Sequence, residues 1–183
     1  NIGINVDTKT LESDNFLVRS RKIFVGLGIL TITPDAPSDM EDLKNIRQSL
    51  DYRTDISFLI KEIKKETRKP IWLIGASRGS NTVGYHAAGL KIQGVALTAT
   101  VTEGKNDTIF DTDFSKIMVP TLVVHNKSDL CHVSPDWGAE VVFKQLTQSS
   151  KKNVLIFKSD DTGHGRDCGA TTFHGFLGIE KKV

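Results

Sequence analysis

The chain has 183 residues, of which 38% are hydrophobic and 25% are charged, a balance typical of a folded globular protein. Its 24 basic and 22 acidic residues leave a net charge of +2, and no basic stripe with interleaved aromatics points to nucleic acid. No apolar run approaches the roughly 20 residues that a membrane span needs, and the length favours one domain over residues 1–183.

Two helices with an apolar strand between them are predicted in the first third of the chain. The first helix covers 15–27, with Ser13 and Asp14 as candidate caps and Gly28 at its end. The stretch ILTITPDAP that follows is typical of a short buried strand stopped by its prolines. Next comes a long amphipathic helix, whose apolar residues recur at i, i+3, i+4 and i+7 from Ile56.

Strands and helices alternate in the rest of the chain. Strands are predicted over 71–74, 94–100, 120–126 and 153–159. A helix of small residues follows the first strand, and another is expected to begin with Ser134 as N-cap and Pro135 at its first position. This alternation predicts an α/β fold, a mostly parallel sheet with helices on both faces.

The two ends of the chain suggest that it is truncated. It starts at Asn1 without a methionine, and its last residues, GIEKKV, resemble a helix that has only begun. We therefore expect a piece of the domain to be missing at each end.

A serine between two glycines follows the strand over 71–74. The sequence GASRG has the G-x-S-x-G pattern of a nucleophile elbow, in which a tight strand-to-helix turn exposes the oxygen of Ser77 at a sheet edge. The same residues also suit an ordinary turn. A serine hydroxyl becomes a good nucleophile when an imidazole takes its proton and a carboxylate orients that imidazole.

A carboxylate and two histidines occur where such partners are expected, because sites in α/β sheets form at the carboxyl ends of strands. Asp129 follows the strand over 120–126, and His164 and His174 follow the strand over 153–159. Serine, aspartate and histidine in this order match the α/β hydrolases. A lone aspartate in a loop is more often explained by plain turn chemistry, which is the alternative for Asp129.

The sequence resembles the α/β-hydrolase superfamily over nearly its whole length. The resemblance rests on GASRG after a strand, on VPTLVVHNKSD as acid strand and loop, and on HGFLGIE at the start of a final helix. More narrowly, DNFLVRSR, DAPSD, SRG and HGFLGIE look like a little-characterised bacterial serine-hydrolase branch that is dienelactone-hydrolase- and esterase-like. In that branch the acid loop and the histidine loop each carry a cysteine. The resemblance favours His174, six residues after Cys168, over His164 as the base.

Each of the two cysteines lies close in sequence to a proposed catalytic residue, one to the acid and one to the base. Cys131 lies two residues after Asp129, and Cys168 lies six residues before His174, so the cysteines should approach if the acid and base do. A disulfide there would contribute about 3–4 kcal/mol through loop entropy and would favour a periplasmic or secreted location. The alternative is two unrelated buried thiols. Without C-x-x-C spacing, no metal site is expected.

The remaining histidines have other expected roles. His86 lies on the helix after the elbow and should be packed, and His132 belongs to the acid loop, where a structural or surface role is expected. His125 lies inside the acid strand, too early to meet Ser77.

An oxyanion hole should accompany the elbow. The backbone N–H of Arg78 is the expected first donor, while its guanidinium either pairs with nearby acids or binds an anionic substrate group. The second donor normally comes from a loop after an earlier strand. The stretch NIGIN resembles the tail of that loop, with Gly3 marking the region, so this donor is expected near or before Asn1.

These patterns predict a serine hydrolase that cleaves a carboxylic ester or related acyl compound through the triad Ser77, Asp129 and His174, with no cofactor and no metal. The alternative is a non-catalytic binding protein on a hydrolase scaffold. The short polar connection over 100–118 contains no lid, which favours small soluble acyl substrates over long-chain lipids, with peptides and thioesters as alternatives. The sequence specifies no oligomeric state.

Overall fold

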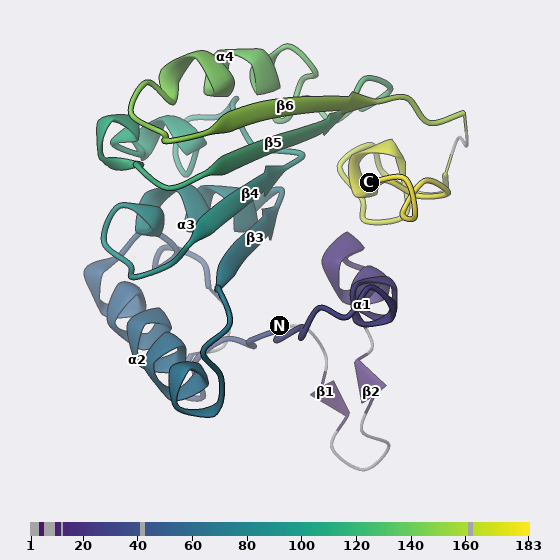
Figure 1. The fold of residues 1–183 in the computed structure, drawn as a ribbon. Helices are drawn as coiled ribbons and strands as arrows, with labels where there is room; N and C mark the ends of the chain where they lie inside the picture. The colour runs from purple at the N-terminus through teal and green to yellow at the C-terminus, as the bar shows by residue number, and fades with distance from the viewer. Residues whose placement is uncertain (1–3, 6–9, 12, 41–42, 161–162) are drawn as a thin grey trace.

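A parallel sheet forms the centre of the molecule in the part of the chain that the computed structural model describes, residues 4–5, 10–11, 13–40, 43–160 and 163–183 (Figure 1). Neighbouring strands pair in parallel and in chain order, which confirms the predicted α/β class. The strands are β3 (Trp72–Ala76), β4 (Gly94–Thr98), β5 (Thr121–Asn126) and β6 (Lys152–Phe157).

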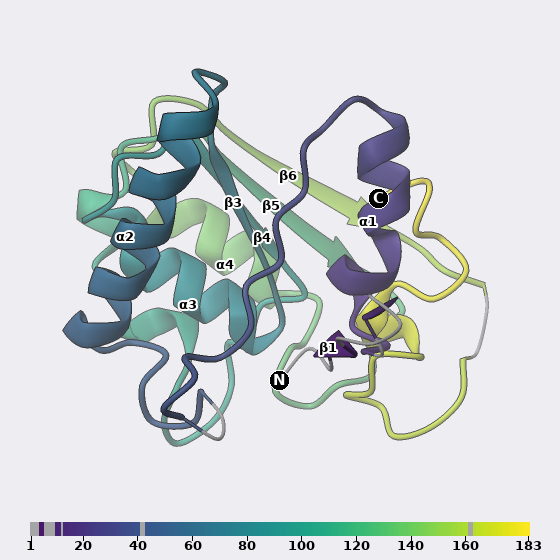
Figure 2. The ribbon, with the colours of Figure 1, turned by 90° about the horizontal axis from the view of Figure 1, so that it is seen from below.

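Three helices cover one face of this sheet (Figure 2). They are α2 (Leu50–Glu66), α3 (Arg78–Ala87) and α4 (Gly138–Gln145). Helices α3 and α4 make the crossover connections that parallel strands require, and two 3₁₀ turns, η1 (Ile109–Asp111) and η2 (Phe114–Lys116), lie between β4 and β5. The apolar side chains buried in this layer include Ile60, Val83, Val95, Leu97, Val123 and Val142.

The other face is covered by α1 (Phe16–Gly26) and by the C-terminal segment, residues 163–183, which contains the 3₁₀ turn η3 (Phe173–Gly175) (Figure 2). A second apolar cluster fills the space between them and the sheet. Its buried members are Phe16, Ala99, Val124, Phe176 and Ile179. The carboxyl ends of the strands point toward this C-terminal segment, so residues that follow the strands meet it there (Figure 1).

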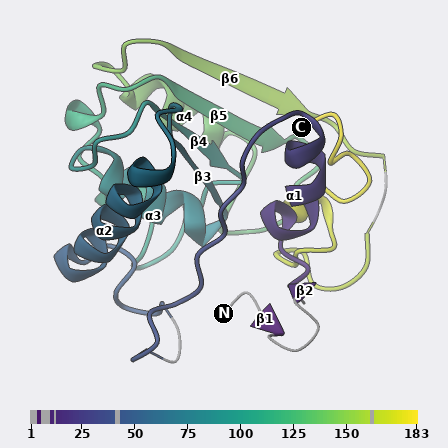
Figure 3. The same ribbon diagram turned by 60° about the horizontal axis from the view of Figure 1, so that its bottom comes forward.

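A short antiparallel pair of strands, β1 (Ile4–Asn5) and β2 (Thr10–Leu11), precedes α1 (Figure 3). This hairpin was not predicted from the sequence, because strands of two residues carry no measurable alternation. No helix within the described ranges has both the length and the apolar character that a bilayer crossing requires.

The predicted buried strand ILTITPDAP is wrong. Residues 29–34 belong to an irregular segment that connects α1 to α2 (Figure 2). Leu30 in this segment is 72% exposed. A strand needs a neighbour that accepts and donates its backbone hydrogen bonds, and this segment pairs with no described strand. Apolar composition alone therefore misled the prediction.

The predicted starts of two helices, α1 and α4, also need correction. Helix α1 is capped by Asn15 in place of Ser13 or Asp14, since the Leu17 N–H donates to Asn15 Oδ1 at 3.0 Å. Helix α4 begins at Gly138 rather than after Ser134, whose side-chain oxygen is buried without a hydrogen-bond partner.

The stretch HGFLGIE does not open a regular final helix. Its first two residues complete η3, which ends before Phe176. The φ of Phe176, 57°, is left-handed and therefore stops a right-handed helix.

Candidate active site

The turn between β3 and α3 consists of one residue, Ser77, with φ 54° and ψ −125°. A residue with a side chain rarely adopts positive φ, so this backbone is strained. Two backbone hydrogen bonds hold it: the Ser77 N–H donates to the Thr98 carbonyl at 2.9 Å, and the Ser80 N–H donates to the Ser77 carbonyl at 2.9 Å.

The two glycines of the pattern play different roles. A Cβ atom on Gly75 would collide with the carbonyl group of Gly79, so only glycine allows the first turn of α3 to lie against the end of β3. At Gly79 itself a Cβ atom would meet no atom within 4 Å. The first glycine is thus required by close backbone approach, and the second is not.

The backbone N–H of Arg78 is the first of α3 and donates no hydrogen bond to any described residue. It is free to donate to a ligand beside Ser77. The Arg78 guanidinium pairs with Asp107 at 2.7 Å, which agrees with the first of its two expected roles. Gly3, the marker of the second expected oxyanion donor, lies outside the described residues.

Asp129 and His174 are in direct contact. His174 Nδ1 lies 2.8 Å from Asp129 Oδ2, and both side chains are buried. The other carboxylate oxygen, Oδ1, accepts from the Cys131 N–H at 2.9 Å. Because an ionised carboxylate only accepts hydrogen bonds, Nδ1 of the histidine carries the hydrogen, and Nε2 is left as a basic nitrogen.

The backbone around His174 is fixed by side chains that sequence reasoning missed. Thr172 Oγ1 accepts from the His174 N–H at 3.3 Å, and Asn126 Nδ2 at the end of β5 donates to the Phe173 carbonyl at 2.9 Å. The only sequence signal for Asn126 is a polar residue that ends a buried strand. These bonds orient the imidazole toward the acid loop.

Ser77 is not joined to this pair. Its hydroxyl makes no hydrogen bond with any described residue, and His174 Nε2 is buried without a partner. Ser77 follows β3 and Asp129 follows β5, so both lie at the carboxyl edge of the same sheet. The structure therefore brings the predicted acid and base into contact and leaves the predicted nucleophile outside hydrogen-bonding distance.

A disulfide joins the acid loop to the C-terminal segment. Cys131 is buried and Cys168 is exposed, and their sulfur atoms lie 2.06 Å apart. Asp129, Cys131 and His174 also form a group of three potential metal ligands within 4.8 Å of one another. Because the Cys131 sulfur is bonded to Cys168, it offers no thiolate, and the group does not fit a metal ion.

The other histidines differ in their surroundings. His164, the alternative base, is exposed, and its backbone N–H donates to the Thr171 carbonyl at 2.8 Å. His125 is buried, and its Nε2 lies 3.5 Å from Asp129 Oδ2. Burial lowers the pKa of His125, an effect that the Asp129 carboxylate partly opposes. From the sequence, His125 was expected only to lie too early in the strand to meet Ser77, and its proximity to Asp129 was not predicted.

Neither a protein-family model nor a curated protein matches the chain. An α/β serine hydrolase homologue from Coxiella burnetii has a similar structure, with a TM-score of 0.60 and 18% identity, covering 79% of this chain and 67% of that one. A monoacylglycerol lipase from Paleococcus ferrophilus gives a TM-score of 0.44 and 16% identity, and the match covers 58% of this chain and 65% of the lipase chain. An acylaminoacyl peptidase from Pyrococcus horikoshii gives a TM-score of 0.48 and 16% identity, and the match covers 70% of this chain and 26% of the peptidase chain.

The matched region thus spans less than two thirds of the lipase chain and about a quarter of the peptidase chain. At 18% identity the likeness to the Coxiella burnetii protein concerns the fold. Together with the parallel strand order and the turn at Ser77, it shows that this chain has the α/β-hydrolase fold.

Proposed function

We propose that the protein is a serine hydrolase that cleaves a carboxylic ester or a related acyl compound through an acyl-enzyme. The observation that carries this proposal is the buried 2.8 Å contact between His174 Nδ1 and Asp129 Oδ2, at the sheet edge where Ser77 follows β3. A buried acid–imidazole pair of this kind is what a serine needs to act as a nucleophile.

In the proposed reaction the Ser77 hydroxyl attacks the acyl carbon while His174 Nε2 takes its proton. Asp129 stabilises the imidazolium that forms, and the imidazolium then protonates the leaving alcohol. Water, deprotonated by the same Nε2, attacks the acyl-enzyme and releases the acid, and Ser77 recovers its proton. For this sequence Ser77 Oγ and His174 Nε2 must approach to hydrogen-bonding distance, a contact that often tightens only when substrate is bound.

The negative oxygen of the tetrahedral intermediate needs donors beside Ser77. The free N–H of Arg78, at the start of α3, supports its role as one donor, and the positive end of the helix dipole adds to it. The second donor, expected in the loop that Gly3 marks, stays a prediction, because Gly3 lies outside the described residues.

A second candidate function is a binding protein that keeps the hydrolase scaffold without the chemistry. The observation that favours it is the missing hydrogen bond between Ser77 and His174 within the described residues. The intact acid–base pair favours catalysis instead, because a binding module has no need of it.

Labelling with a fluorophosphonate probe distinguishes these two functions. A hydrolase should become covalently labelled at Ser77, and the label should disappear in Ser77→Ala and in heat-denatured protein. Ser115→Ala, which changes an exposed serine far along the chain, is the control and should label like the wild type. A folded wild type that takes no label would contradict the proposal and favour the binding protein.

The substrate class can then be narrowed by acyl chain length. The connection between β4 and β5 contains only two short 3₁₀ turns, which supports short, soluble acyl groups over long-chain lipids. We expect kcat/KM to be highest for short-chain aryl esters in a series of graded chain length. A maximum at long chains would contradict this preference.

A further inference from the structure

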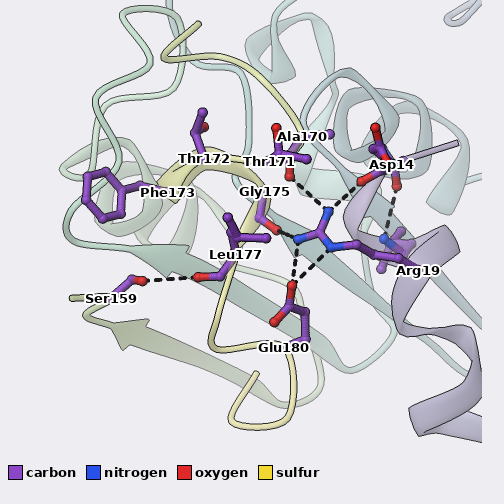
Figure 4. Close-up of polar contacts among 12 residues, drawn as sticks. Asp14, Arg19, Ser159, Ala170, Thr171, Thr172, Phe173, Gly175, Leu177 and Glu180 are labelled. Carbon is purple, nitrogen blue, oxygen red and sulfur yellow. Dashed lines mark hydrogen bonds and ion pairs between the residues drawn. The ribbon is translucent and has the colours of Figure 1, made fainter. Parts of the chain in front are cut away.

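Arg19 on α1 connects the N-terminal helix to the C-terminal segment that carries His174 (Figure 4). Its Nη1 donates to the Ala170 carbonyl at 2.9 Å, and its Nη2 donates to the Gly175 carbonyl at 2.6 Å. Glu180 Oε1 accepts from Nε at 3.0 Å and from Nη2 at 2.8 Å. One side chain thus holds three points of a segment more than 150 residues away in sequence.

The two carbonyls lie on either side of His174, and Gly175 directly follows it. Their peptide groups are in tight contact, since a Cβ atom on Gly175 would collide with the Ala170 carbonyl. Arg19 therefore binds the point at which the segment closes on itself around the histidine. A shift of Gly175 would move the backbone of His174 and so change the distance from Nδ1 to Asp129.

The chemistry of this contact requires a guanidinium. Its planar fork presents five N–H donors, which here reach two carbonyls, one carboxylate and the Asp14 carbonyl at the start of α1. A lysine has a single compact ammonium group and cannot reach the same set of acceptors. The side chains of Arg19 and Glu180 are 22% and 20% exposed, so water competes only partly for these bonds.

Apolar packing holds the same two elements together independently of Arg19. The Phe16 ring on α1 lies against the Phe176 ring, with centroids 4.8 Å apart, and both residues belong to the buried cluster on this face of the sheet. Loss of the guanidinium should therefore leave α1 docked on the C-terminal segment. What it should remove is the exact placement of the backbone around His174.

We infer that Arg19 is a positioning residue for the general base: it fixes residues 170–175 so that the imidazole of His174 stays on Asp129. This inference rests on the proposed function for its kinetic consequence. Its structural consequence, the integrity of the hydrogen bond between Asp129 and His174, does not depend on catalysis.

The test compares Arg19→Gln and Arg19→Lys with Arg21→Gln. Arg21 is the matched control because it lies on the same helix and its Nη1 donates to the Val18 carbonyl of that helix. Arg19→Gln should lower kcat by about 10- to 100-fold with little change in KM, the size expected when a catalytic group is displaced by about 1 Å. Arg19→Lys should recover little of this loss, and Arg21→Gln should behave like the wild type.

A second readout follows the acid–base pair directly. The proton between His174 Nδ1 and Asp129 should give a low-field proton NMR signal, which is expected in the wild type and in Arg21→Gln and should be broadened or lost in Arg19→Gln. Glu180→Gln keeps both carbonyl contacts of Arg19 and should retain the signal and most of kcat. Circular dichroism and thermal unfolding establish that each variant is folded.

The outcomes separate the inference from the proposed function. A folded Arg19→Gln with wild-type kcat and an unchanged low-field signal overturns the inference. If both Arg19 variants fail to fold, the residue acts in folding and the inference is also overturned. If the wild type has no activity but the signal is lost in Arg19→Gln, the proposed function fails while the positioning role stands.

Discussion

The turn at Ser77 and the pair of Asp129 and His174 lie at the same edge of the sheet but are built in different ways. The turn is determined by neighbours in sequence, because the collision that Gly75 avoids is with Gly79, four residues away. The pair is assembled from β5, the C-terminal segment and α1 by hydrogen bonds and a disulfide that join distant parts of the chain. The turn should therefore fail when a single backbone contact is violated, whereas the pair should fail when one of its long-range connections is removed.

Removal of the proposed base should have the largest effect. His174→Ala leaves Ser77 without a proton acceptor, and we expect kcat to fall by about 10⁴–10⁶, as in known triads. His164→Ala is the control, since His164 is exposed and forms no hydrogen bond or ion pair with Asp129 among the described residues, and it should retain most of the activity. Steady-state kinetics on a short-chain ester measure both. A reversed result would assign the base to His164 and leave the fold unaffected.

The difference between the two regions also explains what the sequence could predict. The turn is recognisable from GASRG because all its determinants are local, and the order of Ser77, Asp129 and a histidine follows from strand order. The contacts of Arg19 and the proximity of His125 to Asp129 were not predicted, because neither helical nor strand periodicity reports such contacts. The segment ILTITPDAP failed for a related reason: whether an apolar stretch becomes a strand depends on a neighbouring strand, which its own residues do not reveal.

Removal of the disulfide tests whether the pair of Asp129 and His174 depends on connections between distant parts of the chain. Cys168→Ser removes the bond between the acid loop and the C-terminal segment while keeping the buried Cys131. Since the bond closes a loop with a separation of 37 residues, we expect the free energy of unfolding to fall by about 3–4 kcal/mol. Activity should fall as well, because the Cys131 N–H binds Asp129 Oδ1. Urea unfolding with and without reductant measures the change.

The Cys168→Ser variant is its own control, because reductant should not change its free energy of unfolding further. Mass spectrometry of a non-reduced digest should show the peptides of Cys131 and Cys168 linked in the wild type. Two free thiols in protein isolated under oxidising conditions would contradict the prediction and remove the reason to expect a periplasmic or secreted location.

Substitutions of Gly75 and Gly79 test whether the turn at Ser77 is determined by residues close in sequence. Gly75→Ala forces a Cβ atom against the Gly79 carbonyl, and we expect it to destabilise the protein by about 1–3 kcal/mol or more and to abolish probe labelling of Ser77. Gly79→Ala is the matched control, with open space around the new Cβ and a favourable helix propensity, and it should be neutral or stabilising. Thermal unfolding distinguishes the two. Equal effects would show that close approach at Gly75 does not determine the turn.

The smallest expected effect concerns pH and the helix that follows the elbow. His86 on α3 is fully buried, and its Nε2 lies 2.7 Å from the Arg47 carbonyl. Burial lowers the pKa of His86, the Arg47 carbonyl opposes this, and the Arg53 guanidinium lowers it further. In the unfolded chain a histidine titrates near a pKa of about 6.5. Between the lower folded value and about 6.5 the unfolded state binds more protons, so acidification favours unfolding.

The stability that comes from keeping His86 neutral is thus complete above about pH 6.5 and is lost as the pH falls toward the folded pKa, at no more than about 1.4 kcal/mol per pH unit. His86→Gln removes the titrating group and offers an amide donor to the Arg47 carbonyl, so it should flatten this slope. Urea unfolding at closely spaced pH values measures it in both proteins. His125, whose pKa is also lowered by burial, contributes a slope of the same sign beside Asp129 and His174, so some dependence on pH should remain in the variant. If the free energy of unfolding has the same slope against pH in His86→Gln as in the wild type, protonation of His86 does not contribute to acid unfolding.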